Sequence, residues 1–128
     1  MAPRRPVDPA ELRAVLERIS LWVTGESDEK PSRADLAAAV RLSARTLEQI
    51  APGASVEVRV PPFVAVQCIE GPRHTRGTPP NVVETDPRTW LRMVVGGVDF
   101  DEAVAAGSVE ASGGRAAEIG RLLPLARL

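Results

Sequence analysis

The hydrophobic pattern of this chain changes its period along the sequence, and that change restricts the fold more than any single residue does. Apolar residues recur at helical spacing through the first fifty positions. Between 56 and 60 the sequence reads VEVRV, in which valines alternate with charged residues, as in a strand with one face in solvent. Helical spacing returns after position 86. Strands in the middle with helices at both ends predict an α+β domain with a mostly antiparallel sheet.

Capping signals place the helices. Two of them join a capping aspartate to a proline, at a position where the missing N–H costs nothing. Two others pair a cap residue with an acidic residue three positions later. The signals are Asp8-Pro9, Ser32 with Asp35, Asp86-Pro87, and Asp99 with Glu102, and they predict helices over 8–24, 32–50, 86–95 and 99–106. A last amphipathic helix is expected over 116–123.

The central strands are expected to differ in whether one or both of their faces are covered by other elements. Residues 63–69, FVAVQCI, are apolar on both faces except at Gln67, which predicts a strand covered on both sides. Pro61-Pro62 separates this strand from VEVRV, because proline has no N–H for a strand ladder. Short strands are expected at 82–84 and 109–111.

Length and charge limit the classes of function. The 128 residues fit one domain, with a flexible N-terminus over 1–7, an N-terminal helix over 8–24 and the main fold over 32–128. The net charge of −1 provides no general attraction to nucleic acid, so no nucleic-acid partner is expected. The chain shows no signal peptide and no apolar run of membrane-spanning length. Cys68 is the only cysteine, which favours a reducing cytoplasmic location and a buried structural thiol.

A family resemblance lies in the C-terminal half. Residues 85–125 resemble the closing module of the sterol carrier protein type two superfamily: an aspartate-capped helix ending in glycine, a short helix, a glycine, a strand, a glycine pair and a final helix. The residues that carry it are Thr85, Asp86, Trp90, Leu91, Gly96, Ala103, Gly107, Val109, Gly113 and Leu122-Leu123. VEVRVPPFVAVQC and GPRHTRGTPPNVVETDP are similar to the small single-domain bacterial branch found in actinobacteria. The resemblance covers the chain from about residue 32 onward, and residues 8–24 more loosely.

The resemblance implies a curved sheet of about five strands with helices on one face, preceded here by an extra N-terminal helix. It also implies an apolar cavity between sheet and helices, which in that superfamily holds fatty acyl chains, acyl-CoA or sterols without catalysis. The same apolar residues would equally form a filled core. The candidates for the cavity are Phe63, Val66, Cys68, Trp90, Leu91, Val94, Phe100, Val104 and Ile119.

The loop between Glu70 and Asn81 carries the only histidine, His74, between two arginines. A cysteine–histidine catalytic pair is not expected, because Cys68 lacks the neighbours of a known cysteine-enzyme motif. One histidine with scattered carboxylates also lacks the spacing of a metal site, and no cofactor is expected.

The charges of this loop have two interpretations. Arg73, His74 and Arg76 are candidates for holding a phosphate or carboxylate head group at the mouth of the cavity, since arginine presents a planar fork that matches either anion. Alternatively, the arginines form ion pairs with nearby acidic residues that hold an ordered loop in place, which is the favoured interpretation.

Several functional alternatives stay open. The N-terminal helix is compatible with a lid, a dimer contact, or a cover for the second face of the sheet, and the cover is favoured. The leading hypothesis is non-catalytic binding of an apolar or lipid-like ligand. The alternative is a protein–protein interaction or regulatory module, with a collapsed cavity and a protein partner or homodimer.

Overall fold

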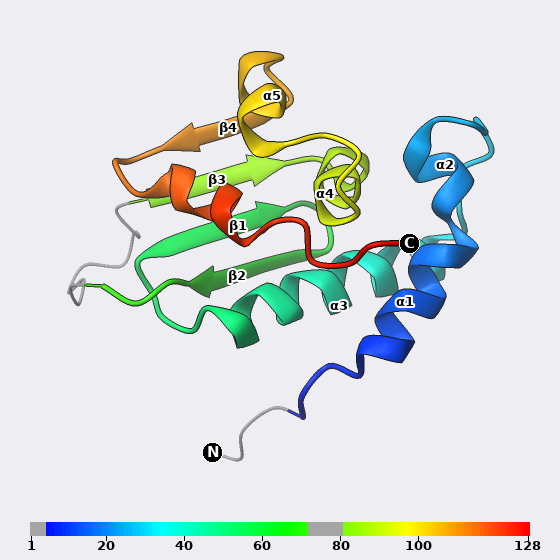
Figure 1. Cartoon of the computed structure of the whole chain (residues 1–128), viewed down its shortest axis with the longest axis horizontal. Helices are drawn as coiled ribbons and strands as arrows, with labels where there is room; N and C mark the ends of the chain where they lie inside the picture. Colours follow the sequence, from blue (N-terminus) through cyan, green and yellow to red (C-terminus); the bar gives the residue numbers. More distant parts are fainter. Residues whose placement is uncertain (1–4, 72–80) are drawn as a thin grey trace.

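The computed structural model describes residues 5–71 and 81–128. Along these residues three helices precede three strands, and two helices, a strand and a 3-10 helix follow, in the arrangement of Figure 1. In chain order they are α1 (Pro9–Arg18), α2 (Ser20–Thr24), α3 (Arg33–Ile50), β1 (Val56–Val60), β2 (Val64–Cys68), β3 (Asn81–Thr85), α4 (Pro87–Val94), α5 (Phe100–Ala105), β4 (Val109–Ser112) and the 3-10 helix η1 (Ala116–Leu122). Within the described residues, no helix is both long enough and apolar enough to cross a bilayer.

The strands form a mixed sheet in the order β2-β1-β3-β4. β1 is antiparallel to β2 and parallel to β3, and β3 is antiparallel to β4. Val58 of β1 therefore lies between Val66 of β2 and Val83 of β3. The described residues contain four strands, the number that the sequence pattern predicts, whereas the family resemblance implies about five. β2 and β3 lie on opposite sides of β1. The chain therefore crosses from one side of β1 to the other between them, since parallel neighbours need a crossover connection.

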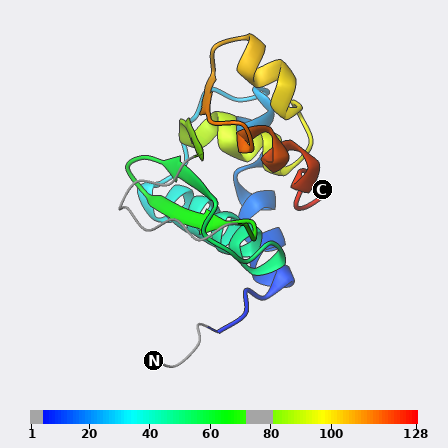
Figure 2. The same cartoon turned by 90° about the vertical axis from the view of Figure 1, so that its left-hand side faces the viewer.

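The two faces of the sheet differ in burial, and we call them the inner and outer faces. Helices cover the inner face (Figures 1 and 2). The buried core side chains of the strands lie on this face. The outer face carries half-buried or exposed side chains, including Ala65 and Gln67 of β2. The prediction that β2 is covered on both sides is therefore wrong: it is an edge strand with helices on one side only. The inner-face residues are Val56, Val58, Val60, Val66, Cys68, Val83 and Val109.

The N-terminal segment forms two helices where the sequence predicted one. Ile19 lies between α1 and α2 with φ −110° and ψ 6°, outside helical geometry, and Gly25 ends α2 in the left-handed conformation. α1 packs against α3, and α2 against α4. The favoured expectation that this segment covers the second face of the sheet is also wrong, because α1 lies on α3 in the helical layer (Figure 1).

Two arginines of α4 bind the end of α2. The Nε of Arg88 donates to the carbonyl of Trp22 at 3.0 Å, and the Nε of Arg92 donates to the carbonyl of Val23 at 2.8 Å. These carbonyls belong to the last turn of a helix, where helical N–H donors run out, and that of Trp22 also accepts from the N–H of Gly25 at 3.2 Å. Side chains from the central part of the chain thus hold the N-terminal helices in place.

The predicted helix starts are confirmed by side-chain caps. Each capping residue accepts a hydrogen bond from a backbone N–H of the first turn, which satisfies a donor that the helix leaves free. The pairs are Asp8 with Ala10, Ser32 with Asp35, Asp86 with Thr89, and Asp99 with Glu102. The last predicted helix is a 3-10 helix, η1, which crosses the inner side of β3 and β4.

Candidate functional site

The structure brings most of the predicted cavity residues into one buried cluster. Phe63 lies at its margin, half-buried, with the guanidinium carbon of Arg33 5.3 Å from its ring centre. Val104 does not join the cluster, since 37% of its surface is exposed on α5. The buried members are Val66, Cys68, Trp90, Leu91, Val94, Phe100 and Ile119.

Trp90 has its polar atom satisfied inside this cluster. The indole ring is fully buried, and its Nε1 donates to the Oγ of Ser43 on α3 at 2.8 Å. The Ser43 hydroxyl in turn donates to the carbonyl of Ala39 at 2.7 Å. A buried N–H without an acceptor would be costly, so this bond fixes how α4 sits on α3.

The Cys68 thiol has no features of a nucleophile. It is fully buried on the inner face, and burial, followed by the charge of Glu48, raises its pKa to about 11. The thiol is therefore neutral at physiological pH. Within residues 5–71 and 81–128, no three histidine, cysteine or acidic side chains gather to hold a metal ion.

A groove of about 380 Å³ opens at one end of the inner layer, between the end of α3, the end of β2 and η1. Four of its residues are apolar and three are charged. None of the nine predicted cavity residues lines it. The lining residues are Ala51, Pro52, Ile69, Glu70, Glu118, Arg121 and Leu122.

A short hydrogen-bonded junction shapes one wall of the groove. Ile69 has φ +69°, a conformation that a β-branched residue rarely adopts. Its N–H donates to the carbonyl of Ala51 at 2.7 Å, and its carbonyl accepts from the N–H and the Oγ of Ser55 at 3.1 and 2.6 Å. At Gly53, with φ +147°, a Cβ would lie 2.1 Å from the Ile69 carbonyl oxygen. Glycine is therefore required for the end of α3 to approach the end of β2.

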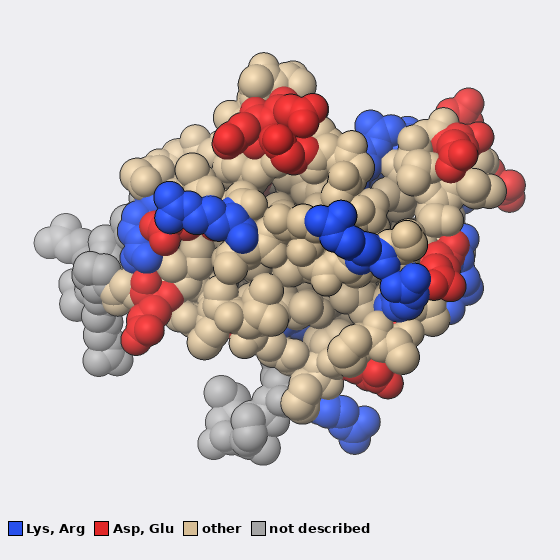
Figure 3. Space-filling view, in the orientation of Figure 1, with Lys and Arg blue, Asp and Glu red and all other residues tan. Residues whose placement is uncertain are grey.

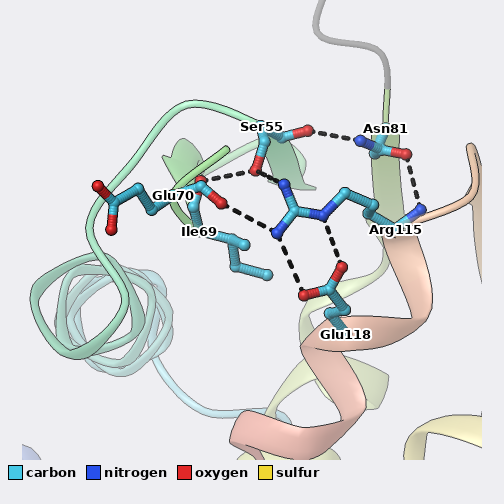
Figure 4. A network of polar contacts seen from close by, with 6 residues as sticks. All are labelled: Ser55, Ile69, Glu70, Asn81, Arg115 and Glu118. Atoms are coloured by element: carbon cyan, nitrogen blue, oxygen red, sulfur yellow. Dashed lines mark hydrogen bonds and ion pairs between the residues drawn. The ribbon is translucent and has the colours of Figure 1, made fainter. Parts of the chain in front are cut away.

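Arg115 connects this junction to η1 (Figure 4). Its Nη1 donates to Ser55 Oγ at 3.2 Å, and its Nη2 donates to the carbonyl of Glu70 at 2.9 Å. Its backbone N–H donates to the Oδ1 of Asn81 at 2.9 Å, and the Asn81 amide donates to the carbonyl of Ser55 at 2.7 Å. One arginine thus binds the ends of β2 and β3 to the helix that borders the groove.

Glu118 completes the hold on Arg115. Its Oε2 accepts from Arg115 Nε at 2.6 Å, and its Oε1 accepts from Arg115 Nη2 at 3.3 Å. The hydrogen bond from Arg115 lowers the pKa of the Glu118 carboxyl, and the nearby charge of Arg121 acts in the same direction. The carboxylate is therefore stabilised in its charged form.

The predicted anion-binding residues cannot be compared with this groove. Arg73, His74 and Arg76 lie outside the described residues. Sequence reasoning also missed the groove itself, because its residues come from three distant segments. The only local sign was the charged pair of Arg115 and Glu118, three positions apart at the start of the last predicted helix.

A mixed sheet with a helical layer on one side defines a small α+β domain. The family model described as bacterial SCP ortholog matches residues 32–125, so the chain belongs to this sterol carrier protein-like family. No curated protein matches the chain. The matched region starts at Ser32, the cap of α3, and α1 and α2 precede it.

Proposed function

We propose that this chain binds an apolar or lipid-like ligand without catalysis, and that the groove between α3, β2 and η1 is the mouth of the binding site. The groove carries this proposal. Its volume of about 380 Å³ falls within the range of roughly 300–1,000 Å³ that is usual for small-molecule sites. Membership of the sterol carrier protein-like family supports the same function.

The apolar residues of the groove supply the driving force for binding. Ile69 and Leu122 face the groove while belonging to or packing against the buried cluster. Each methylene of a ligand buried here would contribute about 0.8 kcal/mol. In this proposal, the buried members of the predicted cavity set, among them Ile119 of η1 and Val94 of α4, form the deeper part of the site.

The chemistry of the described side chains supports binding without catalysis. The Cys68 thiol is buried and neutral, and the Glu118 carboxylate of the groove forms an ion pair with Arg115. Such a pair holds structure and does not transfer protons at neutral pH. A cytoplasmic location agrees with this proposal.

The test compares two leucines. Leu122→Asn places an amide in the groove, whereas Leu21→Asn changes a leucine that is 58% exposed on α2, outside the groove. Affinity for octanol, measured by NMR titration, is expected to fall about tenfold in Leu122→Asn, since the loss of one buried side chain is worth about 1.5 kcal/mol or more. Leu21→Asn should bind as the unaltered protein does. Absence of binding to fatty alcohols, fatty acids and sterols would contradict the proposal.

A second candidate function is protein–protein interaction through the outer face. This face spans all four strands, and no described helix covers it. Two hollows of about 290 and 390 Å³ lie on it, on either side of Glu84. Association with a protein partner or a second copy would slow hydrogen exchange of the backbone amides of the strands. Ligand binding in the groove would instead slow the exchange of the amides of Ile69 and Leu122.

A further inference from the structure

Two arginines of α4 come together at the end of α2, away from the groove. Arg88 and Arg92 are four positions apart, so they lie on the same side of the helix, and both are half-buried. At the exposed Gly25, which has φ +87°, a Cβ would lie 3.1 Å from the Nη2 of Arg92 and 3.8 Å from the Nη2 of Arg88. Both guanidinium groups therefore approach the same point at the surface.

Each of these guanidinium groups is held in place by one donor and keeps the others. The Nε atoms of Arg88 and Arg92 donate to the carbonyls of Trp22 and Val23, at 3.0 and 2.8 Å. The guanidinium carbon of Arg88 also lies 5.0 Å from the ring centre of Trp22. A guanidinium has five N–H donors, and no described residue accepts a hydrogen bond from the terminal nitrogens of either arginine. Two fixed forks are thus left with donors for a ligand.

The charge of this pair is not balanced within the described part of the chain. No ion pair joins Arg88 or Arg92 to a carboxylate there. The carboxylate of Glu26 accepts from the Oγ1 of Thr24 at 2.8 Å, and that of Asp86 caps α4. The carbonyls at a helix end carry at most about half an elementary charge, which is less than the charge of two guanidinium groups. An anion between the two arginines would offset their mutual repulsion.

The surroundings of the pair limit the size of such an anion. Figure 3 shows basic side chains between α4 and α2, with acidic side chains over α5 on one side and over the loop after α2 on the other. The acidic residues of these two segments are Asp101 and Glu102, and Glu26, Asp28 and Glu29. A nucleic acid or an anionic bilayer would meet these carboxylates and be repelled. A compact anion would contact the arginines alone.

We infer that Arg88 and Arg92 form a binding site for one compact dianion, either inorganic phosphate or a phosphate monoester. A phosphate group offers three oxygens and up to two charges to two forks, whereas a carboxylate offers two oxygens and one charge. The bound anion would also hold α4 to the end of α2, since both forks are fixed on carbonyls of α2. This inference does not depend on the groove or on an apolar ligand.

The test is an NMR titration of the full chain with inorganic phosphate, phenyl phosphate and acetate at constant ionic strength. The Nε–H signals of Arg88 and Arg92 report on the site directly. Inorganic phosphate or phenyl phosphate should shift both signals, and the one that binds more tightly identifies the source of the phosphate group. Acetate should bind about fivefold more weakly or less. Raising the pH from about 5.5 to about 7.5 should strengthen phenyl phosphate binding about threefold, because the second pKa of a phosphate monoester is about 6.

Three variants complete the test. Arg88→Gln and Arg92→Gln each remove one fork and one charge and should weaken phosphate binding about fivefold or more. Arg41→Gln is the control, since it removes one positive charge and the same kind of bond, from Nε to the carbonyl of Phe63 at 3.2 Å, on α3. It should bind phosphate as the unaltered protein does.

The unaltered protein keeps the inference testable even where a glutamine variant loosens α2. Absence of a shift at both Nε–H signals, or equal affinities for acetate and phosphate, would overturn the site. An equal loss of phosphate affinity in Arg41→Gln would also overturn it, because the effect would then be one of general charge. Binding of octanol in the groove is measured separately, so failure of this site leaves the proposed function intact.

Discussion

The inner and outer faces of the sheet consist of alternate residues of the same strands, but their surroundings differ. On β1, Val56, Val58 and Val60 are fully buried under the helices, whereas Glu57 and Arg59 between them are half-buried and form an ion pair with each other. Helix–sheet packing therefore stabilises one side only. The comparison indicates that the inner face determines stability and the outer face tolerates substitution.

Adjacent residues of β2 test this comparison most severely. Val66 lies on the inner face and Gln67 on the outer face. Val66→Asp buries a carboxylate without a partner and is expected to lower the free energy of unfolding by about 4 kcal/mol or more. Gln67→Asp should change it by less than about 1 kcal/mol. Urea denaturation followed by circular dichroism measures both, and equal effects would contradict the one-sided core.

Thiol chemistry probes the same two faces at neighbouring positions. Alkylation of Cys68 by iodoacetamide at pH 8 should be about a hundredfold slower in the folded chain than in urea, because the thiol is buried and neutral. A thiol introduced by Gln67→Cys should react at the rate of an exposed thiol. Mass spectrometry distinguishes the two sites.

The raised pKa of Cys68 also gives a pH dependence with a defined sign. The folded state disfavours the thiolate, so the contribution of this group to stability is complete below the thiol's unfolded pKa of 9.0 and falls as the pH rises toward about 11. Cys68→Ala should remove this fall between pH 9 and 11. An unchanged slope in Cys68→Ala would assign the dependence to other groups.

The hydrogen bond between α3 and α4 gives the next largest effect. Ser43→Ala leaves the buried indole N–H of Trp90 without an acceptor and should cost about 1–3 kcal/mol of unfolding free energy. Thr46→Ala is the control, since among the described residues the Thr46 hydroxyl bonds only to the carbonyl of Leu42 in its own helix. Its cost should stay below about 0.5 kcal/mol. Similar costs would show that the Trp90 bond adds nothing to helix packing.

The smallest predicted effect is on the outer face, and it is a stabilisation and not a loss of stability. Glu84 and Glu110 lie directly opposite each other on β3 and β4. Glu110→Arg replaces a repulsive pair with an attractive one and should stabilise the chain by about 0.2–1 kcal/mol. Ser112→Arg places an arginine opposite the uncharged Val82 and should have less effect. Thermal melts at low ionic strength would resolve the difference.

Local signals predicted the elements of the fold well. Aspartate–proline pairs and capping boxes gave the helix starts, because they act within one turn. The alternation of valine and charge gave β1 and its buried face. Such local signals do not determine the order of the strands in the sheet. The sequence of β1 does not indicate that β3 pairs with it in parallel. The break at Ile19 was missed for a similar reason, since the apolar spacing continues through it.

The candidate site was less predictable than the fold. The groove joins a helix end, a strand end and a 3-10 helix, and Ile69 enters it through a positive φ that its residue type disfavours. Such a junction depends on tertiary contacts with Ser55 and Ala51. The resemblance to sterol carriers identified the family, but it pointed to core residues and not to the groove.

The position of α1 and α2 ahead of the matched region has a consequence for how the chain can be divided. Leu12, Leu16 and Val23 are almost completely buried against a part of the chain that begins at Ser32. A polypeptide starting at Ser32 would expose the apolar face of α3 that α1 covers, and we expect it to self-associate or misfold. The unit that folds is thus longer than the region that the family model matches.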